Sequence, residues 1–262
     1  MHIDEANLSN LIKLWHKYGS QPVEAVKLPL LVANTGWPQR CWIDSRALPD
    51  GDSSQLQSDV NDNLWVENIP KSAIFPLWPT LRSNNNLPSS KYEPQVIEQS
   101  LLDKHWHCAF EQTAMYLTLS SDAKHSPRTH PGFKVRPVNT CEDIKMWADI
   151  GSEAFGYQID LSVIQRLVDD EEIQLLIGWD NGQAIACGLL YKTGDIIGVH
   201  QVGVKLAFQG KGFAKCFMLD IIVACSKWQG KHVVLQASQV GKPLYEKLGF
   251  KSQFLIQNFQ RV

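Results

Sequence analysis

A glycine-bearing turn between an apolar strand and an amphipathic helix is the segment of this sequence best suited to chemistry. The strand ends at Val202-Gly203-Val204, and Gly210 and Gly212 lie in the turn before a helix that begins near Phe213. A helix N-terminus offers backbone N–H groups without intrahelical partners and a partial positive charge. Glycine lets an anion approach these groups closely. The segment therefore predicts a phosphate-binding turn.

The helix after this turn is predicted from apolar residues that recur at three- and four-residue spacing. They are Phe213, Phe217, Met218, Ile221, Ala224 and Cys225. The helix should run to about Trp228 and end at Gly230. Two common nucleotide fingerprints do not fit, because the sequence has no G-x-x-x-x-G-K-[ST] and lacks the third glycine of G-x-G-x-x-G.

The turn resembles motif A of the GNAT superfamily of acyl-CoA N-acyltransferases, whose signature is Q/R-x-x-G-x-G/A. Gln209, Gly212 and Ala214 match this signature. Some thirty residues later, Leu-Tyr-Glu-Lys-Leu-Gly-Phe at 244–250 closely resembles the end of GNAT motif B. The order and spacing of both motifs agree with the family, and the resemblance covers about residues 131–262.

The remaining elements of this part are predicted from residue pattern and agree with that fold. Thr140 and Asp143 form a capping-box signature for a helix, and Asp180-Asn181-Gly182 is a strong hairpin signal. The expected order is β, α, α, β, β, β, α, β, α, β, with strands at 133–138, 173–179, 183–191, 196–204 and 232–237 and a short helix at 161–168. The fold class is therefore α/β of the α+β kind: a GNAT fold with a mixed, mostly antiparallel sheet flanked by helices.

The amino-terminal part has no recognisable binding motif. It holds six of the nine tryptophans, a helical pattern over 8–18 and a strand pattern over 110–119. That strand is reminiscent of the closing strand of GNAT domains, which suggests a smaller α+β domain that is a reduced GNAT-like copy without a cofactor. We expect an amino-terminal domain at 1–120, a polar linker at 121–131 and a GNAT domain at 132–262. His125 and His130 fall in the linker and are given no role.

Composition excludes several classes of partner. The 262-residue chain has a net charge of −2, and neither half is basic, so no nucleic-acid partner is expected. The first residues are acidic and no apolar run approaches about 20 residues, so neither a secretion signal nor a membrane partner is expected. Six cysteines without a C-x-x-C pair indicate reduced thiols in a cytoplasmic protein.

The resemblance implies acetyl-CoA as cosubstrate and assigns residues to it. Val202, Gly203 and Val204 would hold the pantetheine arm and the thioester carbonyl, with Gly203 as host of a strand bulge. Lys211 and Lys215 would add positive charge, although solvated lysines are the plainer interpretation. The residues expected to contact the rest of the coenzyme are Gln209, Gly210, Lys211, Gly212, Phe213, Ala214, Lys215 and Ser238, the last standing where many members have asparagine.

Two residues are candidates for proton transfer. Tyr245 matches the motif B tyrosine that in many GNAT enzymes protonates the departing thiolate; the alternative is a tyrosine that packs its ring and wets its hydroxyl. His200 lies two residues before Val202, so strand alternation predicts that both share a face with Val204, where an imidazole could act as general base. A structural histidine is equally compatible with the sequence. Asp195, Glu153 and water-relayed deprotonation are further options.

The sequence thus predicts an N-acetyltransferase that transfers an acetyl group from acetyl-CoA to a primary amine of a small molecule or peptide by direct attack. The alternative is a catalytically inactive acyl-CoA-binding sensor or regulatory module. A nucleotide-binding module is disfavoured by the antiparallel hairpins. His105 and His107 are too few ligands for a metal site, and no metal is expected. The oligomeric state and the acceptor amine are not predicted.

Overall fold

The structure is a computed structural model that describes residues 2–23, 31–34, 36–44, 63–81, 93–119 and 130–261. The chain divides into two compact units. The first comprises Met1–Ala114, Ala237–Val240 and Gln253–Val262, and the second comprises Met115–Gln236 and Gly241–Ser252. Most of the expected linker, 121–131, lies outside the described residues, and the three-part division at 120 and 131 stays a prediction.

The first unit is a mixture of short strands and helices around an aromatic core. Its elements are α1 (Ile3–Lys17), β1 (Ser20–Pro22), β2 (Leu31–Asn34), β3 (Cys41–Ile43), η2 (Leu64–Asn68), β4 (Phe75–Leu77) and α3 (Pro94–Asp103), with most of β5 (Trp106–Thr118) and of β11 (Lys251–Arg261). Strands β1, β2 and β3 form an antiparallel sheet, and β4 pairs antiparallel with β11. The core includes Trp65, Phe75, Ile97, Trp106 and Phe259, all at most 2% exposed.

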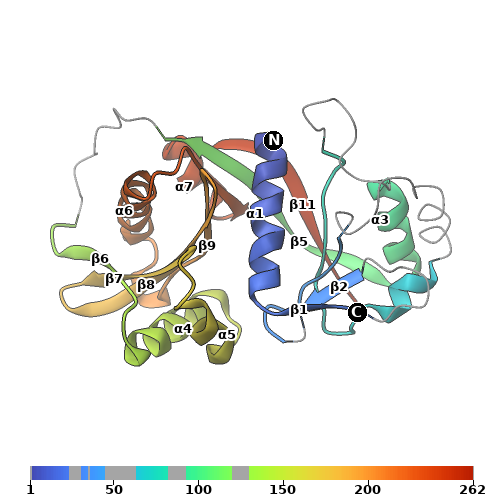
Figure 1. The fold of residues 1–262 in the computed structure, drawn as a ribbon, viewed down its shortest axis with the longest axis horizontal. Coiled ribbons are helices and arrows are strands. Elements are labelled where there is room, and N and C mark those ends of the chain that lie inside the picture. The colour runs from blue at the N-terminus through green and yellow to red at the C-terminus, as the bar shows by residue number, and fades with distance from the viewer. Residues whose placement is uncertain are drawn as a thin grey trace. The chain divides into compact units, whose positions relative to one another are not determined.

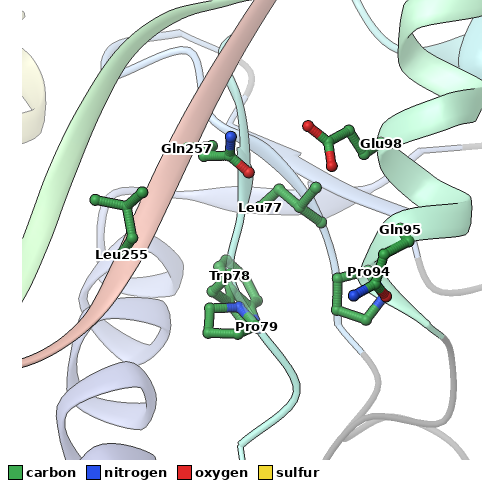
Figure 2. Close-up of a pocket in the computed structure, with 8 residues that line it drawn as sticks. All are labelled: Leu77, Trp78, Pro79, Pro94, Gln95, Glu98, Leu255 and Gln257. Atoms are coloured by element: carbon green, nitrogen blue, oxygen red, sulfur yellow. The ribbon is translucent and has the colours of Figure 1, made fainter.

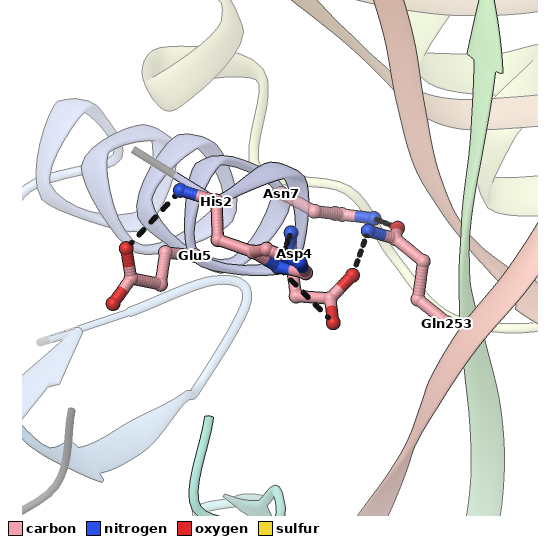
Figure 3. A network of polar contacts seen from close by, with 5 residues as sticks. All are labelled: His2, Asp4, Glu5, Asn7 and Gln253. Carbon is pink, nitrogen blue, oxygen red and sulfur yellow. Dashed lines mark hydrogen bonds and ion pairs between the residues drawn. The ribbon is translucent and has the colours of Figure 1, made fainter. Parts of the chain in front are cut away.

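Helix α1 begins earlier than its apolar pattern predicts, because an unusual cap extends it. The His2 imidazole Nδ1 accepts from the Asp4 N–H at 3.3 Å, and the Glu5 carboxylate accepts from the His2 N–H at 3.4 Å. The same turn is tied to β11, since Asn7 Nδ2 donates to Gln253 Oε1 at 2.5 Å and Gln253 Nε2 donates to Asp4 Oδ1 at 2.6 Å (Figure 3). These contacts satisfy polar groups at a helix end that would otherwise need water.

The second unit follows the predicted order of elements. They are β6 (Phe133–Pro137), α4 (Cys141–Phe155), α5 (Leu161–Leu167), β7 (Ile173–Asp180), β8 (Gln183–Thr193), β9 (Ile196–Val204), η3 (Leu206–Phe208), α6 (Phe213–Lys227), β10 (His232–Ser238) and α7 (Lys242–Lys247). Strands β6 to β9 pair antiparallel in sequence order, and β10 pairs parallel with β9. The whole large sheet has the order β4-β11-β5-β10-β9-β8-β7-β6, so the predicted mixed, mostly antiparallel sheet is confirmed.

Helices cover both faces of the sheet in the second unit, with α4 and α5 on one face and α6 on the other (Figure 1). Glycines allow the close approach. A Cβ on Gly188 of β8 would lie 2.9 Å from the Phe217 ring of α6, and a Cβ on Gly203 of β9 would lie 2.9 Å from the Ala154 Cβ of α4. Gly188 of β8 therefore faces α6, and Gly203 of β9 faces α4.

Two local predictions in this unit are confirmed in detail. Asp143 N–H donates to Thr140 Oγ1, and Thr140 N–H donates to Asp143 Oδ2, each at 3.1 Å, which is the capping box of α4. In the β7–β8 hairpin, Asn181 and Gly182 both have positive φ, at 47° and 86°, as a type I′ turn requires.

All six cysteines are free in the structure. Within the described residues, no helix is long and apolar enough to cross a membrane.

Candidate functional site

The turn before α6 presents a run of unused backbone donors. Gly210 and Gly212 have φ of 72° and 87°, a left-handed backbone that favours glycine. Gly212 is the N-cap of α6 and offers no side chain to the helix. Within the described part of the chain, the N–H groups of residues 210–214 donate to no protein group, whereas those of Lys215 and Cys216 donate to the Gly212 carbonyl. Consecutive free amides at a helix start form an anion-binding site.

Side chains hold this turn at its beginning. Gln209 Nε2 donates to the Val204 carbonyl at 2.9 Å, and Glu153 Oε1 of α4 accepts from the Leu206 N–H at 2.9 Å. The Gln209 side chain thus links the turn to the end of β9. Its predicted contact with the coenzyme stays a prediction, and Glu153, weighed above as a base, is already hydrogen-bonded to the backbone.

The two parallel strands beside this turn part from each other. The ladder between β9 and β10 begins at Ile196 opposite His232 and, within the described residues, ends at Gly198 opposite Val234. Both strands continue past that point, β9 from Val199 to Val204 and β10 through Leu235 and Gln236. The edge of β9 that faces β10 is therefore free of ladder pairing where Val202, Gly203 and Val204 lie. The three predicted residues therefore lie beyond the point where β9 and β10 stop pairing.

The predicted bulge is present in β9, at a different residue. Cys187 lies opposite Gly203 and Leu189 lies opposite His200, so one residue of β8 faces two of β9. Gln201 has a φ of 52° within this bulge. The expectation that Gly203 hosts the bulge is wrong, because Gly203 is required instead by its close packing on Ala154.

The bulge also reverses the strand alternation that was used to place His200. Residues directly opposite in an antiparallel ladder share a face, so His200 and Gly203 point to the same side, which is the side of α4. Val204 points to the other side. The prediction that His200 shares a face with Val202 and Val204 is therefore wrong.

His200 is buried and neutral. It is 8% exposed, and burial lowers the pKa of its imidazole to about 3, against the opposing effect of a hydrogen bond with the Gln236 side chain. Gln236 lies two residues beyond the last ladder pair of β10, as His200 does on β9. The side-chain hydrogen bond thus links the two strands just after their backbone pairing ends.

We expect this burial to make stability fall in acid. The unfolded chain binds a proton at His200 below about pH 6.5, whereas the folded chain does so only near pH 3, so the free energy of unfolding should fall as pH drops through this window. The slope from this group is about 1.4 kcal/mol per pH unit. Denaturant unfolding of wild type and His200→Gln at pH 7 and pH 4.5 measures this effect. Between these two pH values the free energy of unfolding should fall less in the variant than in wild type. His107→Gln, at an exposed histidine, is the control, and an identical pH dependence in all three proteins would contradict the assignment.

Tyr245 lies in the middle of α7, and its ring contacts Phe250 edge-on at a centroid distance of 5.7 Å. The residue is half-buried, and burial raises the pKa of its phenol to about 12. Among the described residues, its hydroxyl has no hydrogen-bond partner. The phenol is therefore protonated at any physiological pH and is free to donate.

The other predicted residues are exposed at the surface or lie far from the turn before α6. Lys211 and Lys215 are exposed, and Lys211 Nζ lies 5.6 Å from the Phe208 ring centroid. Ser238 is the exposed last residue of β10.

Asp195 precedes β9, at the opposite end of that strand from Val204, and a hydrogen bond from Lys231 lowers the pKa of its carboxyl. Asp195 is thus remote from the turn.

His130 is the residue at the turn that the sequence reasoning missed. Its Nε2 lies 2.8 Å from the Lys211 carbonyl oxygen, and its ring stacks on the Phe213 ring at 4.2 Å. The contact joins residues 81 positions apart. No spacing or local pattern around His130 indicates it.

Comparison with known proteins identifies the fold of a segment that includes most of the second unit and part of the first. Residues 137–261 match the family model for the acetyltransferase (GNAT) domain. These residues form a GNAT domain. The chain is therefore an acyltransferase, with N-acetyltransferase activity in general terms, and the family resemblance drawn from motifs A and B is confirmed.

Solved structures of GNAT proteins resemble the chain over most of its length. A GCN5-related N-acetyltransferase from Kribbella flavida has a TM-score of 0.63 and 14% identity, covering 98% of this chain and 93% of its own. One from Sphaerobacter thermophilus has a TM-score of 0.57 and 14% identity, covering 88% and 76%. A GCN5-related N-acetyltransferase-like protein from Streptococcus suis has 0.56 and 12%, covering 97% and 99%. These identities show the fold alone. No curated protein matches the chain in sequence.

The GNAT match leaves most of the first unit without an assignment. That unit contains a cavity of about 200 Å³ between β4, α3 and β11, walled by Leu77, Trp78, Pro94 and Leu255, with Glu98 as its carboxylate (Figure 2). His105 has a φ of 62° and precedes β5, so it does not share a strand with His107. In the ranges that the structure describes, no group of three or more His, Cys, Asp or Glu residues is placed to hold a metal ion.

Proposed function

We propose that this protein transfers an acetyl group from acetyl-CoA to a primary amine of a small molecule or peptide, by direct attack in a ternary complex. The observation that carries the proposal is the run of N–H groups at residues 210–214, which donate to no protein group in the described part of the chain and follow the end of β9 that no longer pairs with β10. A diphosphate needs such donors, and a pantetheine arm needs a free strand edge. The GNAT domain supports the use of an acyl-CoA donor.

The charge and backbone of the turn suit the donor. Gly210 and Gly212 leave the amides open, since a Cβ at Gly210 would meet no atom of the described residues within 4 Å. The α6 N-terminus adds a partial positive charge. In this proposal the exposed Lys211 and Lys215 screen the diphosphate, the free edge of Val202–Val204 holds the pantetheine arm, and Ser238 contacts the coenzyme.

Tyr245 is proposed to donate the proton that the reaction must deliver to sulfur. The amine lone pair attacks the thioester carbon, a C–N bond forms, and the C–S bond breaks to release a thiolate. The Tyr245 hydroxyl, kept protonated by its raised pKa, donates to that sulfur, and the proton lost by the amine nitrogen restores the phenol through water. Protons and charge balance over the cycle.

His200 is a poor base for the attacking amine. An alkylammonium has a pKa of about 10.4, and the pKa of His200 is about 3, so direct transfer between them would cost about 10 kcal/mol. The general-base role of His200 stays a prediction that this difference argues against. We propose instead that water relays the proton and that His200, hydrogen-bonded to Gln236, holds the two strands at the point where they part.

Two measurements test this function. Calorimetry with purified protein should detect binding of acetyl-CoA, and a screen of polyamines, amino acids, aminoglycosides and peptide amino termini should reveal free CoA release with at least one acceptor. Absence of affinity for any CoA derivative would refute the proposal. Binding without release of CoA across the screen would favour the alternative, an acyl-CoA sensor. The Tyr245 hydroxyl, which has no hydrogen-bond partner among the described residues, supports the enzyme.

A further inference from the structure

We propose that His130 is a positioning residue of the diphosphate-binding turn: it orients the Lys211–Gly212 peptide so that the Gly212 N–H faces the bound diphosphate. The inference rests on the proposed function for the identity of the ligand. It assigns a role to a histidine that lies outside motifs A and B.

The hydrogen bond defines the state of the imidazole. A carbonyl oxygen only accepts, so at 2.8 Å from the Lys211 oxygen the Nε2 atom of His130 carries the proton and donates. The ring cannot turn freely, because it stacks on the Phe213 ring at 4.2 Å with an interplanar angle of 23°. Phe213 is buried and also contacts Phe133 and Phe208, at centroid distances of 5.8 Å and 5.7 Å. The donor is thus fixed on a packed aromatic group.

Fixing one end of a peptide group fixes the other. In a trans peptide the C=O and the following N–H point in opposite directions. Because the Lys211 carbonyl points to His130, the Gly212 N–H points away from the imidazole. This N–H is the middle one of the unused donors at residues 210–214.

The Lys211–Gly212 peptide needs a contact that fixes its orientation, because the glycine backbone around it rotates easily. Gly210 and Gly212 flank the Lys211–Gly212 peptide and both have left-handed φ, and glycine restricts rotation least. The Glu153 and Gln209 side chains bond to the backbone at Leu206 and Val204, which lie before residue 210. In the described part of the chain, the His130 hydrogen bond is the side-chain contact to the backbone of 210–214.

The test compares an acyl donor that has a diphosphate with an acyl donor that lacks it. His130→Phe keeps a ring to stack on Phe213 but cannot donate a hydrogen bond. His130→Gln keeps a hydrogen-bond donor without the ring. We expect His130→Phe to raise the KM and Kd for acetyl-CoA about tenfold, as for the loss of one hydrogen bond to a charged group. Its kcat should be unchanged, and its kinetics with S-acetylpantetheine, which has no diphosphate, should equal those of wild type. His130→Gln should restore part of the affinity.

His232→Phe is the matched control, because His232 is another histidine of the second unit that contacts both a ring, Tyr116, and a side-chain hydroxyl, Thr118. His232→Phe should leave the kinetics with acetyl-CoA and with S-acetylpantetheine unchanged. Unchanged acetyl-CoA affinity in His130→Phe, or an equal loss for acetyl-CoA and S-acetylpantetheine, would overturn the proposal. If His130→Phe does not fold, His130→Ala against His130→Gln gives the same comparison. Wild-type protein that binds no CoA would instead refute the proposed function.

Discussion

Tyr245→Phe is expected to lower kcat by about 10²- to 10⁴-fold, the usual contribution of a positioned proton donor. Affinity for acetyl-CoA should change little, because the substitution keeps the ring that packs on Phe250 and removes only the hydroxyl. Steady-state kinetics with a confirmed acceptor, together with calorimetric titration of acetyl-CoA, separate the two effects.

Tyr116→Phe serves as the control for the loss of a phenol, since Tyr116 lies in β5 outside the proposed site. Wild-type turnover should also persist at alkaline pH until about pH 11, because the Tyr245 phenol ionises only near its raised pKa of about 12. Equal turnover of Tyr245→Phe and wild type would remove Tyr245 from the mechanism.

Gly210→Glu is expected to weaken acetyl-CoA binding by about 10²-fold or more. A carboxylate there would stand beside the diphosphate, where repulsion between like charges a few ångströms apart costs about 3 kcal/mol. Within the ranges that the structure describes, a Cβ at Gly210 would meet no atom within 4 Å, so the effect should come from the ligand and from a modest backbone strain at φ 72°.

Matched substitutions separate these causes. Gly194→Glu places the same side chain at another open glycine with a similar φ, 65°, in the β8–β9 turn. Gly194→Glu should introduce a similar backbone strain and leave the affinity for acetyl-CoA unchanged. Gly210→Gln keeps the size without the charge and should lose less affinity than Gly210→Glu. If Gly194→Glu weakens binding as much as Gly210→Glu, the turn before α6 does not hold the diphosphate.

The elements of the second unit were predictable because their signals are local. The apolar period of α6, the capping box at Thr140 and the hairpin turn at Asn181-Gly182 each depend on residues within a few positions. Motifs A and B added the strand-turn-helix order. The first unit was less predictable, because β1, β3 and β4 have three residues each, too few for a period to appear.

The backbone of the candidate site was more predictable than the placement of its side chains. Glycine signals the positive φ at 210 and 212, but Gln201 adopts a positive φ of 52° without any signal in residue type. That one bulge changed the face assigned to His200, because alternation holds only in a regular strand. His130 could not be inferred, since its partner Lys211 is brought to it only by tertiary packing.

The pairing of β4 with β11 has a consequence for how the protein is made. Leu77 of the first unit lies opposite Gln257, which follows it by 180 residues along the sequence, so this edge of the amino-terminal unit stays unpaired until β11 has been synthesised. The first unit therefore needs a strand that is made after the whole second unit. We expect nascent chains halted before residue 251 to expose β4 to proteases, and nascent chains that include β11 to protect that strand.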